Sequence, residues 1–171
     1  VNPVRRSQLV LGKWLAAVVF SIVGLVLVMV LNLFALSQVP LEQMGISFII
    51  GAREIVGILL ITIPLGFFAT SMQMFVGIFA RSFKDAQVYI GLMSFLPLLP
   101  YFFNILNTTG RTFWMNFVPM LGQNMLLTDV VSGRTPMMMD FVLAAISLLG
   151  WSMAFITMAT LLLRRERVIF S

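Results

Sequence analysis

Four long runs of uncharged, predominantly apolar residues constrain the fold of this chain more than any other feature. The runs cover residues 14–36, 55–80, 86–106 and 141–163. Because an α-helix rises about 1.5 Å per residue, about 20 residues cross the hydrocarbon core of a bilayer. A helix also bonds all of its own backbone groups, as lipid requires. The sequence therefore predicts an all-α fold, with residues 1–171 forming a single transmembrane domain, a polytopic helical bundle of four spans.

The composition excludes most other classes of protein. Hydrophobic residues make up 60% of the chain and charged residues 10%, whereas soluble domains carry about 25% charged residues. Cysteine and histidine are both absent, which excludes disulfides, Cys/His metal sites and Ser/His or Cys/His catalytic pairs. The sequence contains no Walker motif for binding ATP. We therefore expect no enzyme active site, and no cofactor or metal bound by this chain.

Basic residues are distributed unevenly between the two sides of the predicted bundle. One side carries eight of the 11 lysines and arginines: Arg5, Arg6, Lys13, Arg81, Lys84, Arg164, Arg165 and Arg167. The other side carries the remaining three, which are Arg53, Arg111 and Arg134. Because basic loops are retained in the cytosol, both termini are expected there. The same rule accounts for the net charge of +5 without a nucleic-acid partner.

The segment between the third and fourth runs is expected to form a short interfacial or re-entrant extracellular helix. Residues 107–140 include Trp114, Pro119 and Gln123, and are too polar to span the membrane but too apolar to lie free in water. We expect this helix to dip into the outer interface.

Prolines are expected to distort two of the spans. Pro64 should kink the second span, because proline cannot continue the helical hydrogen-bond ladder. Pro97 and Pro100 should bend or end the third span near its exit from the membrane.

The predicted spans contain few groups that could carry chemistry. None of them holds a charged residue, so they offer no carboxylate relay. Their notable polar side chains are Asn32, Gln73 and Asn104. Each of these either bonds to a neighbouring helix, which is the commoner role, or lines a pathway.

Three patches on the expected cytosolic side together resemble the permease subunit of type-2 ATP-binding-cassette (ABC) exporters, close to the NatB-like sodium-extrusion group. Residues 3–13 resemble the end of a short cytosolic helix and the start of a membrane helix, and the residues implied in coupling to an ATPase are Pro3, Arg5, Arg6 and Lys13. Residues 80–89 resemble the family's tight cytosolic turn, carried here by Arg81, Phe83, Lys84, Asp85 and Gln87. The third patch is residues 164–170, and the extracellular residues Pro119 and Gln123 also fit the pattern.

The resemblance implies a larger assembly in a bacterial plasma (inner) membrane. This chain would correspond to the last four of six helices, and its first residue, Val1, agrees with a fragment of a longer permease. A second permease copy and a separate cytosolic ABC ATPase, which binds ATP, are the implied partners. Arg5 and Arg6 would contact that ATPase or anionic membrane lipid. Sodium or another small cation is the implied substrate, while the uncharged spans leave lipids, peptides and drugs as alternatives.

Two other functions remain compatible with the residues. The spans would serve equally as anchors and binding faces of a membrane scaffold or assembly factor. They would also serve as the frame of an intramembrane enzyme whose catalytic groups lie outside this segment. An autonomous channel is less favoured, because no ring-forming charged motif lines a span.

Overall fold

The computed structural model describes residues 6–39, 51–106 and 112–165. Within these ranges the chain forms helices and turns, without a strand. The α-helices are α1 (Arg6–Ser37), α2 (Ala52–Gly77), α3 (Phe83–Met93), α4 (Leu98–Leu106), α5 (Leu121–Val131) and α6 (Met138–Arg165), and a 3-10 helix, η2 (Phe113–Phe117), precedes α5. Helices α1, α2 and α6, and the stretch comprising α3 and α4, are each long and apolar enough to cross a membrane. The predicted all-α fold with four spans and a short additional helix is confirmed.

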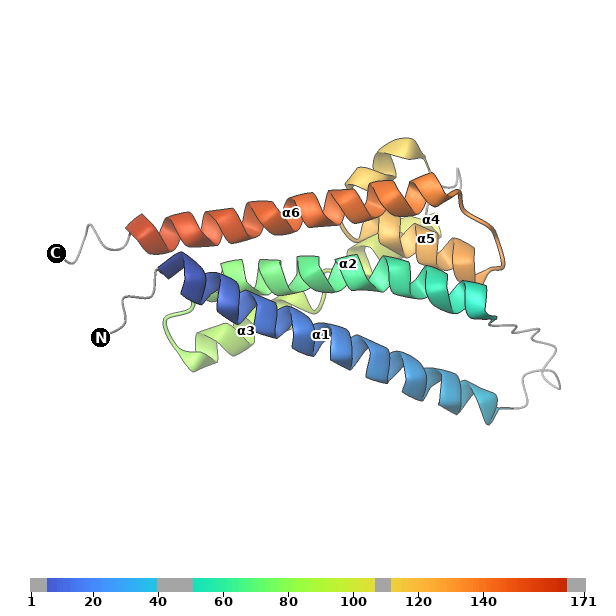
Figure 1. The fold of residues 1–171 in the computed structure, drawn as a ribbon, viewed down its shortest axis with the longest axis horizontal. Helices are drawn as coiled ribbons and strands as arrows, with labels where there is room; N and C mark the ends of the chain where they lie inside the picture. The colour runs from blue at the N-terminus through green and yellow to red at the C-terminus, as the bar shows by residue number, and fades with distance from the viewer. Residues whose placement is uncertain (1–5, 40–50, 107–111, 166–171) are drawn as a thin grey trace.

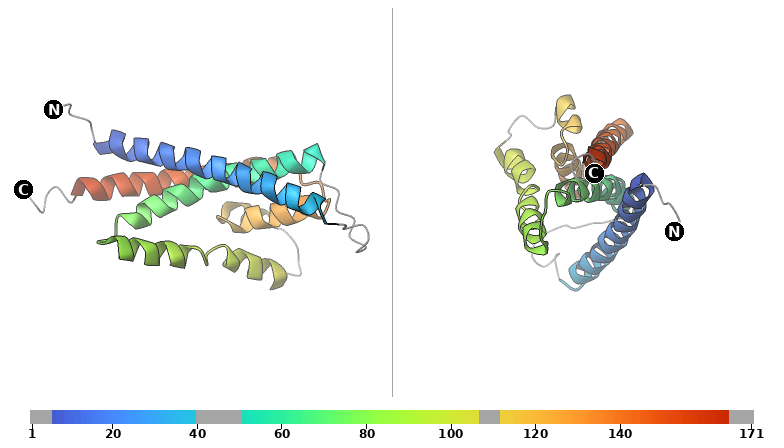
Figure 2. Two further views of the ribbon diagram at one scale, coloured as in Figure 1. Left: turned by 90° about the horizontal axis from the view of Figure 1, so that it is seen from below. Right: turned by 90° about the vertical axis from the view of Figure 1, so that its left-hand side faces the viewer.

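The spans run up and down along one axis, so the bundle has two distinct ends (Figure 1). The beginning of α1, the α2–α3 turn and the end of α6 lie at one end, which we call the terminal end. The end of α1 and the beginnings of α2 and α6 lie at the opposite end, which we call the far end. Helices η2 and α5 also belong to the far half of the bundle (Figures 1 and 2).

Helix α2 forms the centre of the bundle, since it packs against α1, α5 and α6. One third of its most apolar stretch is buried, compared with 6% for α1 and none for α3 and α4. Gly66 lets α1 approach closely, because a Cβ atom there would lie 3.3 Å from Leu25 Cδ1 and 3.4 Å from Ser21 Oγ. Nearer the terminal end, the indole N–H of Trp14 donates a hydrogen bond to Ser71 Oγ at 2.9 Å. Close packing and this polar bond together hold α1 against α2.

The two peripheral spans lie on opposite sides of α2 and α6 (Figure 2). In the described part of the chain, α3 packs against α2, α4 packs against α5, and neither packs against α1. Both peripheral spans therefore keep large apolar side chains exposed, including Phe20 on α1 and Phe95 beside α3. Such faces are those of helices that contact lipid or other protein segments inside a membrane.

The third span is broken nearer its middle than the sequence indicated. Helix α3 ends at Met93 and α4 begins at Leu98, so the break lies at Pro97 rather than near the exit from the membrane. Residues 94–96 instead form tight turns, in which the amide of Phe95 donates to Leu92 and that of Leu96 to Met93. Pro100 does not interrupt the helix, because it lies in the first turn of α4, where an amide hydrogen has no helical partner to lose.

Helix α2 runs through Pro64 as one element of 26 residues. Proline lacks the amide hydrogen that would bond to the carbonyl of Leu60 one turn earlier, so this carbonyl loses its helical donor. Helix α2 also ends at Gly77, three residues before the end of the predicted span at residue 80. The amides of residues 78–80 continue in turns that lead to α3.

Candidate functional site

The α2–α3 turn places an apolar ring between two cations at the terminal end. Ser82 caps α3 by accepting a hydrogen bond from the amide of Asp85 at 3.1 Å. Asp85 itself lies in the first turn of α3, where a carboxylate favours the positive end of the helix. Phe83 is 80% exposed, and its neighbours Arg81 and Lys84 are also exposed. The turn is therefore a compact surface that combines an apolar anchor with positive charge.

The other residues implied in coupling are described to different degrees. Lys13 is exposed in the early part of α1, and the beginning of α1 lies at the same end of the bundle as the turn (Figure 1). Gln87 is exposed on α3, one turn after Phe83. Pro3 and Arg5 lie outside the described residues, and for Arg6 only the backbone position at the start of α1 is described. The structure thus places Lys13 and the turn at one end of the bundle, and their contact with a partner stays a prediction.

Helix α5 lies against α2 inside the bundle. It runs antiparallel to α2: Val130, at its end, packs against Gly57, and Leu126 packs against Ile61. Its first residue, Leu121, lines the same pocket as Phe68. Phe68 is 16 residues along α2 from Ala52, which corresponds to about 24 Å of helix. The start of α5 therefore lies near the middle of the bundle, which favours the re-entrant over the interfacial alternative that the sequence left open.

The chain reverses direction at the tip between η2 and α5. Pro119 fixes its own backbone, and the residue before it, Val118, is extended as a residue preceding proline prefers. Met120 then adopts φ +68°, a left-handed conformation that is uncommon for a residue with a side chain. Gly122 lies directly against η2, since a Cβ atom there would be 2.8 Å from the carbonyl oxygen of Met115. A tight reversal and a close backbone contact together fix α5 against η2.

Two buried amide side chains connect this hairpin to α6. Gln123 is 2% exposed, and its Nε2 donates to the carbonyl of Ala144 at 3.1 Å. Asn116 is 1% exposed, and its Nδ2 donates to Asp140 Oδ1 at 3.5 Å. Asp140 and Ala144 are four residues apart, so both bonds reach the same face of α6. The hairpin is therefore anchored to α6 by two polar contacts one helical turn apart.

Both amides keep a buried oxygen without a partner, namely Asn116 Oδ1 and Gln123 Oε1. Exchanging the nitrogen and oxygen of either amide by a 180° rotation would not give the oxygen a partner, because the nitrogen would then lose the acceptor on α6 to which it donates. An unpaired buried acceptor costs about 1–3 kcal/mol. Within the described part of the chain, these two oxygens are the buried side-chain polar atoms that lack a hydrogen-bond partner.

The remaining predicted residues have simpler surroundings. Trp114 is half exposed and packs edge-on against Phe103 of α4, with ring centroids 6.3 Å apart. Pro119 lines an apolar pocket beside α4. The sequence indicated Gln123 but missed Asn116, because a short 3-10 helix rich in aromatic residues has no periodicity that marks a buried position.

Of the three notable polar residues of the spans, one takes the commoner role considered for them. Asn104 Nδ2 donates to Asn124 Oδ1 at 3.3 Å and to Thr128 Oγ1 at 3.1 Å, so it joins α4 to α5. Asn32 instead bonds to the carbonyl of Val28 in its own helix at 2.8 Å. Gln73 is exposed on α2. Of these three side chains, Asn104 is therefore the one that connects two helices in the described part of the chain.

Comparisons with known proteins agree with the resemblance of the cytosolic patches. Residues 1–168 match the family model described as "ABC-2 family transporter protein". The chain is also similar to the ABC transporter permease protein NatB of Bacillus subtilis (strain 168), with 28% identity over 138 residues. That match covers 78% of this chain and 35% of the relative, so the chain spans about a third of the relative's length. No solved structure matches the chain.

Proposed function

The chain belongs to the ABC-2 transporter family, and on this premise we propose that it forms part of a membrane permease that exports its substrate at the expense of ATP. The observation that carries the proposal is the family match over residues 1–168, which covers all four spans and the re-entrant helix. ATP would be bound and hydrolysed by a separate ABC ATPase. A second permease copy would complete the transport unit, in contact with the exposed faces of the peripheral spans or separated from them by membrane lipid.

The described geometry supports contact with the ATPase at the terminal end and a response of the re-entrant helix in the far half of the bundle. At the terminal end, the exposed Phe83 ring and its flanking cations offer a surface for an ATPase. Helix α2 begins at the far end and leads directly into this turn. A displacement of the turn would therefore reach the re-entrant helix through α2, against which α5 packs. This is a route from ATP hydrolysis to the interior of the bundle.

Sodium or another small cation is the substrate class that we propose. The support is the pair of unpaired amide oxygens, Asn116 Oδ1 and Gln123 Oε1, because neutral oxygen ligands suit hard cations. The described residues contain no group of three or more acidic side chains that could hold a metal ion. Neutral oxygens of the re-entrant hairpin are thus the candidates for contacting a cation in transit.

Reversing the charge of two N-terminal arginines is expected to release the ATPase. In the full-length permease, Arg5→Glu combined with Arg6→Glu should reduce the amount of co-purified ATPase by at least about tenfold, because truncating or reversing charges at an interface costs several kcal/mol. The charge-matched control is Arg53→Glu with Arg134→Glu at the far end, which should leave the ATPase bound. Unchanged co-purification after the first pair of substitutions would refute the contact, and a wild-type permease that binds no ATPase would favour a scaffold.

The proposed orientation places the terminal end, including both chain termini, in the cytosol of a bacterial cell. Residues 1–171 contain no cysteine, so a Ser82→Cys substitution in the α2–α3 turn, made in a full-length permease with any other cysteines replaced, gives a direct test. An impermeant thiol reagent added to intact cells is expected to leave this cysteine unmodified, and to modify it after the membrane is opened. A Cys at Thr135, at the far end, is the matched control and should react in intact cells. Modification of the cysteine at Ser82, but not of the one at Thr135, in intact cells would show that the topology is opposite to the proposed one.

A further inference from the structure

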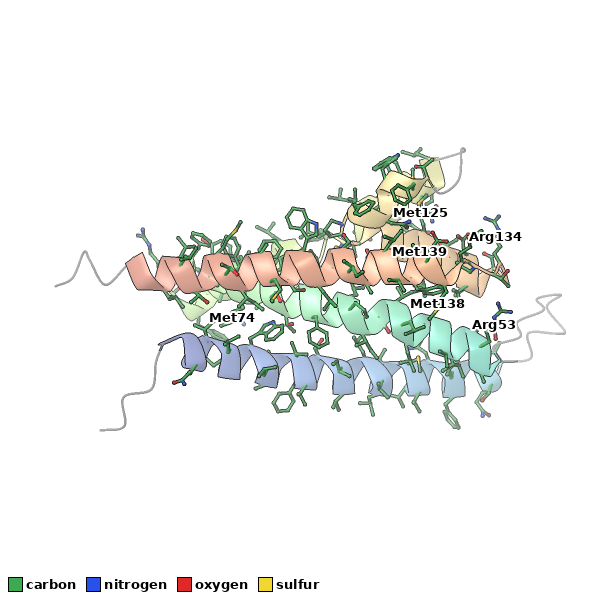
Figure 3. All side chains as sticks on the ribbon, turned by 45° about the horizontal axis from the view of Figure 1, so that its top comes forward. Arg53, Met74, Met125, Arg134, Met138 and Met139 are labelled. Carbon is green, nitrogen blue, oxygen red and sulfur yellow. The ribbon has the colours of Figure 1, made fainter. Side chains whose placement is uncertain are left out.

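A pocket of about 330 Å³ lies at the far end, where the beginning of α2, the segment after α5 and the beginning of α6 meet. Two arginines line it, Arg53 on α2 and Arg134 beyond α5. Figure 3 shows both side chains at this end of the molecule, near Met138 of the same pocket. The sequence assigns only three of the 11 basic residues to this side of the bundle. The convergence of two of them on one pocket is therefore a specific feature of the fold.

The two arginines keep hydrogen-bond donors available in the pocket, although Arg134 forms one ion pair and Glu54 also lines the pocket. The Arg53 side chain is exposed and has no hydrogen-bond or ion-pair partner among the described residues. Arg134 uses Nη1 to contact Asp129 Oδ1 at 3.2 Å, while its side chain remains 76% exposed and keeps its other donors. The carboxylate of Glu54 turns back to accept the amide of Gly51 at 2.8 Å. The arginine donors consequently remain available for an anion such as a phosphate.

The wall below the arginines is apolar and continues along α2. Val56 and Leu60 line the pocket and are 54% and 42% exposed. They follow Arg53 at spacings of three and seven residues, so all three lie on one face of the helix. A ligand that combines a phosphate with a hydrocarbon chain would match this stripe, whereas a free phosphate would use only its upper part.

We infer that this pocket binds the headgroup of an anionic phospholipid, with the phosphate between Arg53 and Arg134 and an acyl chain along Val56 and Leu60. Two observations carry the inference: the paired arginine donors, and the exposed apolar stripe that leads from them into the span. The inference does not rest on transport or on an ATPase. The pocket would anchor the beginning of α2 and the end of the re-entrant helix to the lipid leaflet around the far end.

Binding of phosphatidylglycerol to the full-length permease, measured by native mass spectrometry during a lipid titration, tests the inference. Replacing both arginines, Arg53→Gln with Arg134→Gln, is expected to weaken binding about tenfold, since two charge-assisted hydrogen bonds are lost. The matched control, Lys13→Gln with Lys84→Gln, removes the same charge at the terminal end and should leave the affinity of this site unchanged. The double variant Arg53→Lys with Arg134→Lys should retain most of the binding, which separates charge recognition from misfolding.

Two further probes identify the source of the phosphate. Phosphatidylcholine is expected to bind less tightly than phosphatidylglycerol, and glycerol 3-phosphate is expected not to displace the lipid at equal concentration. The substitution Val56→Asn should weaken the lipid but not glycerol 3-phosphate. Unchanged phosphatidylglycerol binding by the arginine-to-glutamine variant would overturn the inference. Displacement of the lipid by glycerol 3-phosphate would also overturn it, by identifying a site for a soluble anion.

Discussion

Replacing Gly122 with alanine is expected to lower the free energy of unfolding by about 2 kcal/mol and to separate α5 from η2. The new Cβ atom would lie 2.8 Å from the carbonyl oxygen of Met115 and 2.9 Å from Asn116 Cα. Both are backbone atoms, so no side-chain rotation relieves the contact and η2 itself has to move. Because Met115, Leu121 and Met125 form one buried cluster between these helices, the movement would also open apolar packing.

The same substitution at Gly150 of α6 provides a matched control. No atom lies within 4 Å of a Cβ atom built at that position. Alanine is favoured over glycine inside a helix by about 1 kcal/mol, so Gly150→Ala is expected to leave stability unchanged or raise it. Thermal unfolding of both full-length variants in detergent gives the comparison. Equal effects at the two positions would contradict the close approach of α5 and η2.

The number and type of the spans could be predicted because lipid leaves the backbone few alternatives. An uncharged run such as residues 14–36 has to bond its own amides and carbonyls, and a helix does so within a single segment. The helix ends were less predictable, because they depend on polar residues outside the apolar runs. Ser82 starts α3 three residues before the predicted span by capping the amide of Asp85, and Glu54 similarly binds the amide of Gly51 at the start of α2.

The arrangement of the spans could not be predicted from their hydrophobicity. Helices α1 and α2 are both long and apolar enough to cross a membrane, yet α2 is central and α1 is peripheral. In lipid the hydrophobic effect does not distinguish a lipid-facing side from a packed side, so close contacts decide. Such contacts are specific to the folded chain, as where Ser21 and Leu25 approach Gly66.

The candidate site was predicted only in part for a related reason. The cations and Phe83 of the α2–α3 turn belong to one local segment and are exposed in the structure, while their role in coupling stays a prediction. The depth of α5 depends instead on residues far apart in the sequence, such as Gly57 with Val130 and Gln123 with Ala144. The composition of residues 107–140 resembles that of an interfacial segment, and it carries no signal for these pairings.

Replacing Gln123 with methionine is expected to reduce transport without lowering the free energy of unfolding. Methionine has a similar length and flexible shape but no polar nitrogen or oxygen. The substitution removes the 3.1 Å hydrogen bond to the carbonyl of Ala144 and also the unpaired Oε1. An interhelical hydrogen bond in a membrane contributes about 0.6 kcal/mol, whereas an unpaired buried oxygen costs about 1–3 kcal/mol. The free energy of unfolding should therefore stay unchanged or rise.

ATP-driven sodium efflux from vesicles that contain the full-length permease and its ATPase is expected to fall at least about tenfold in the same variant, a loss of about 1.4 kcal/mol. The reason is that the unpaired oxygen of Gln123 would bind a passing cation, or would gain a hydrogen bond in a second arrangement of the hairpin. Methionine has no amide oxygen and can do neither. Gln73→Met, at an exposed position of α2, is the chemically matched control and should leave efflux unchanged. Normal efflux after Gln123→Met, with unchanged thermal unfolding, would show that the fold merely tolerates this unpaired oxygen and would remove Gln123 from the proposed cation path.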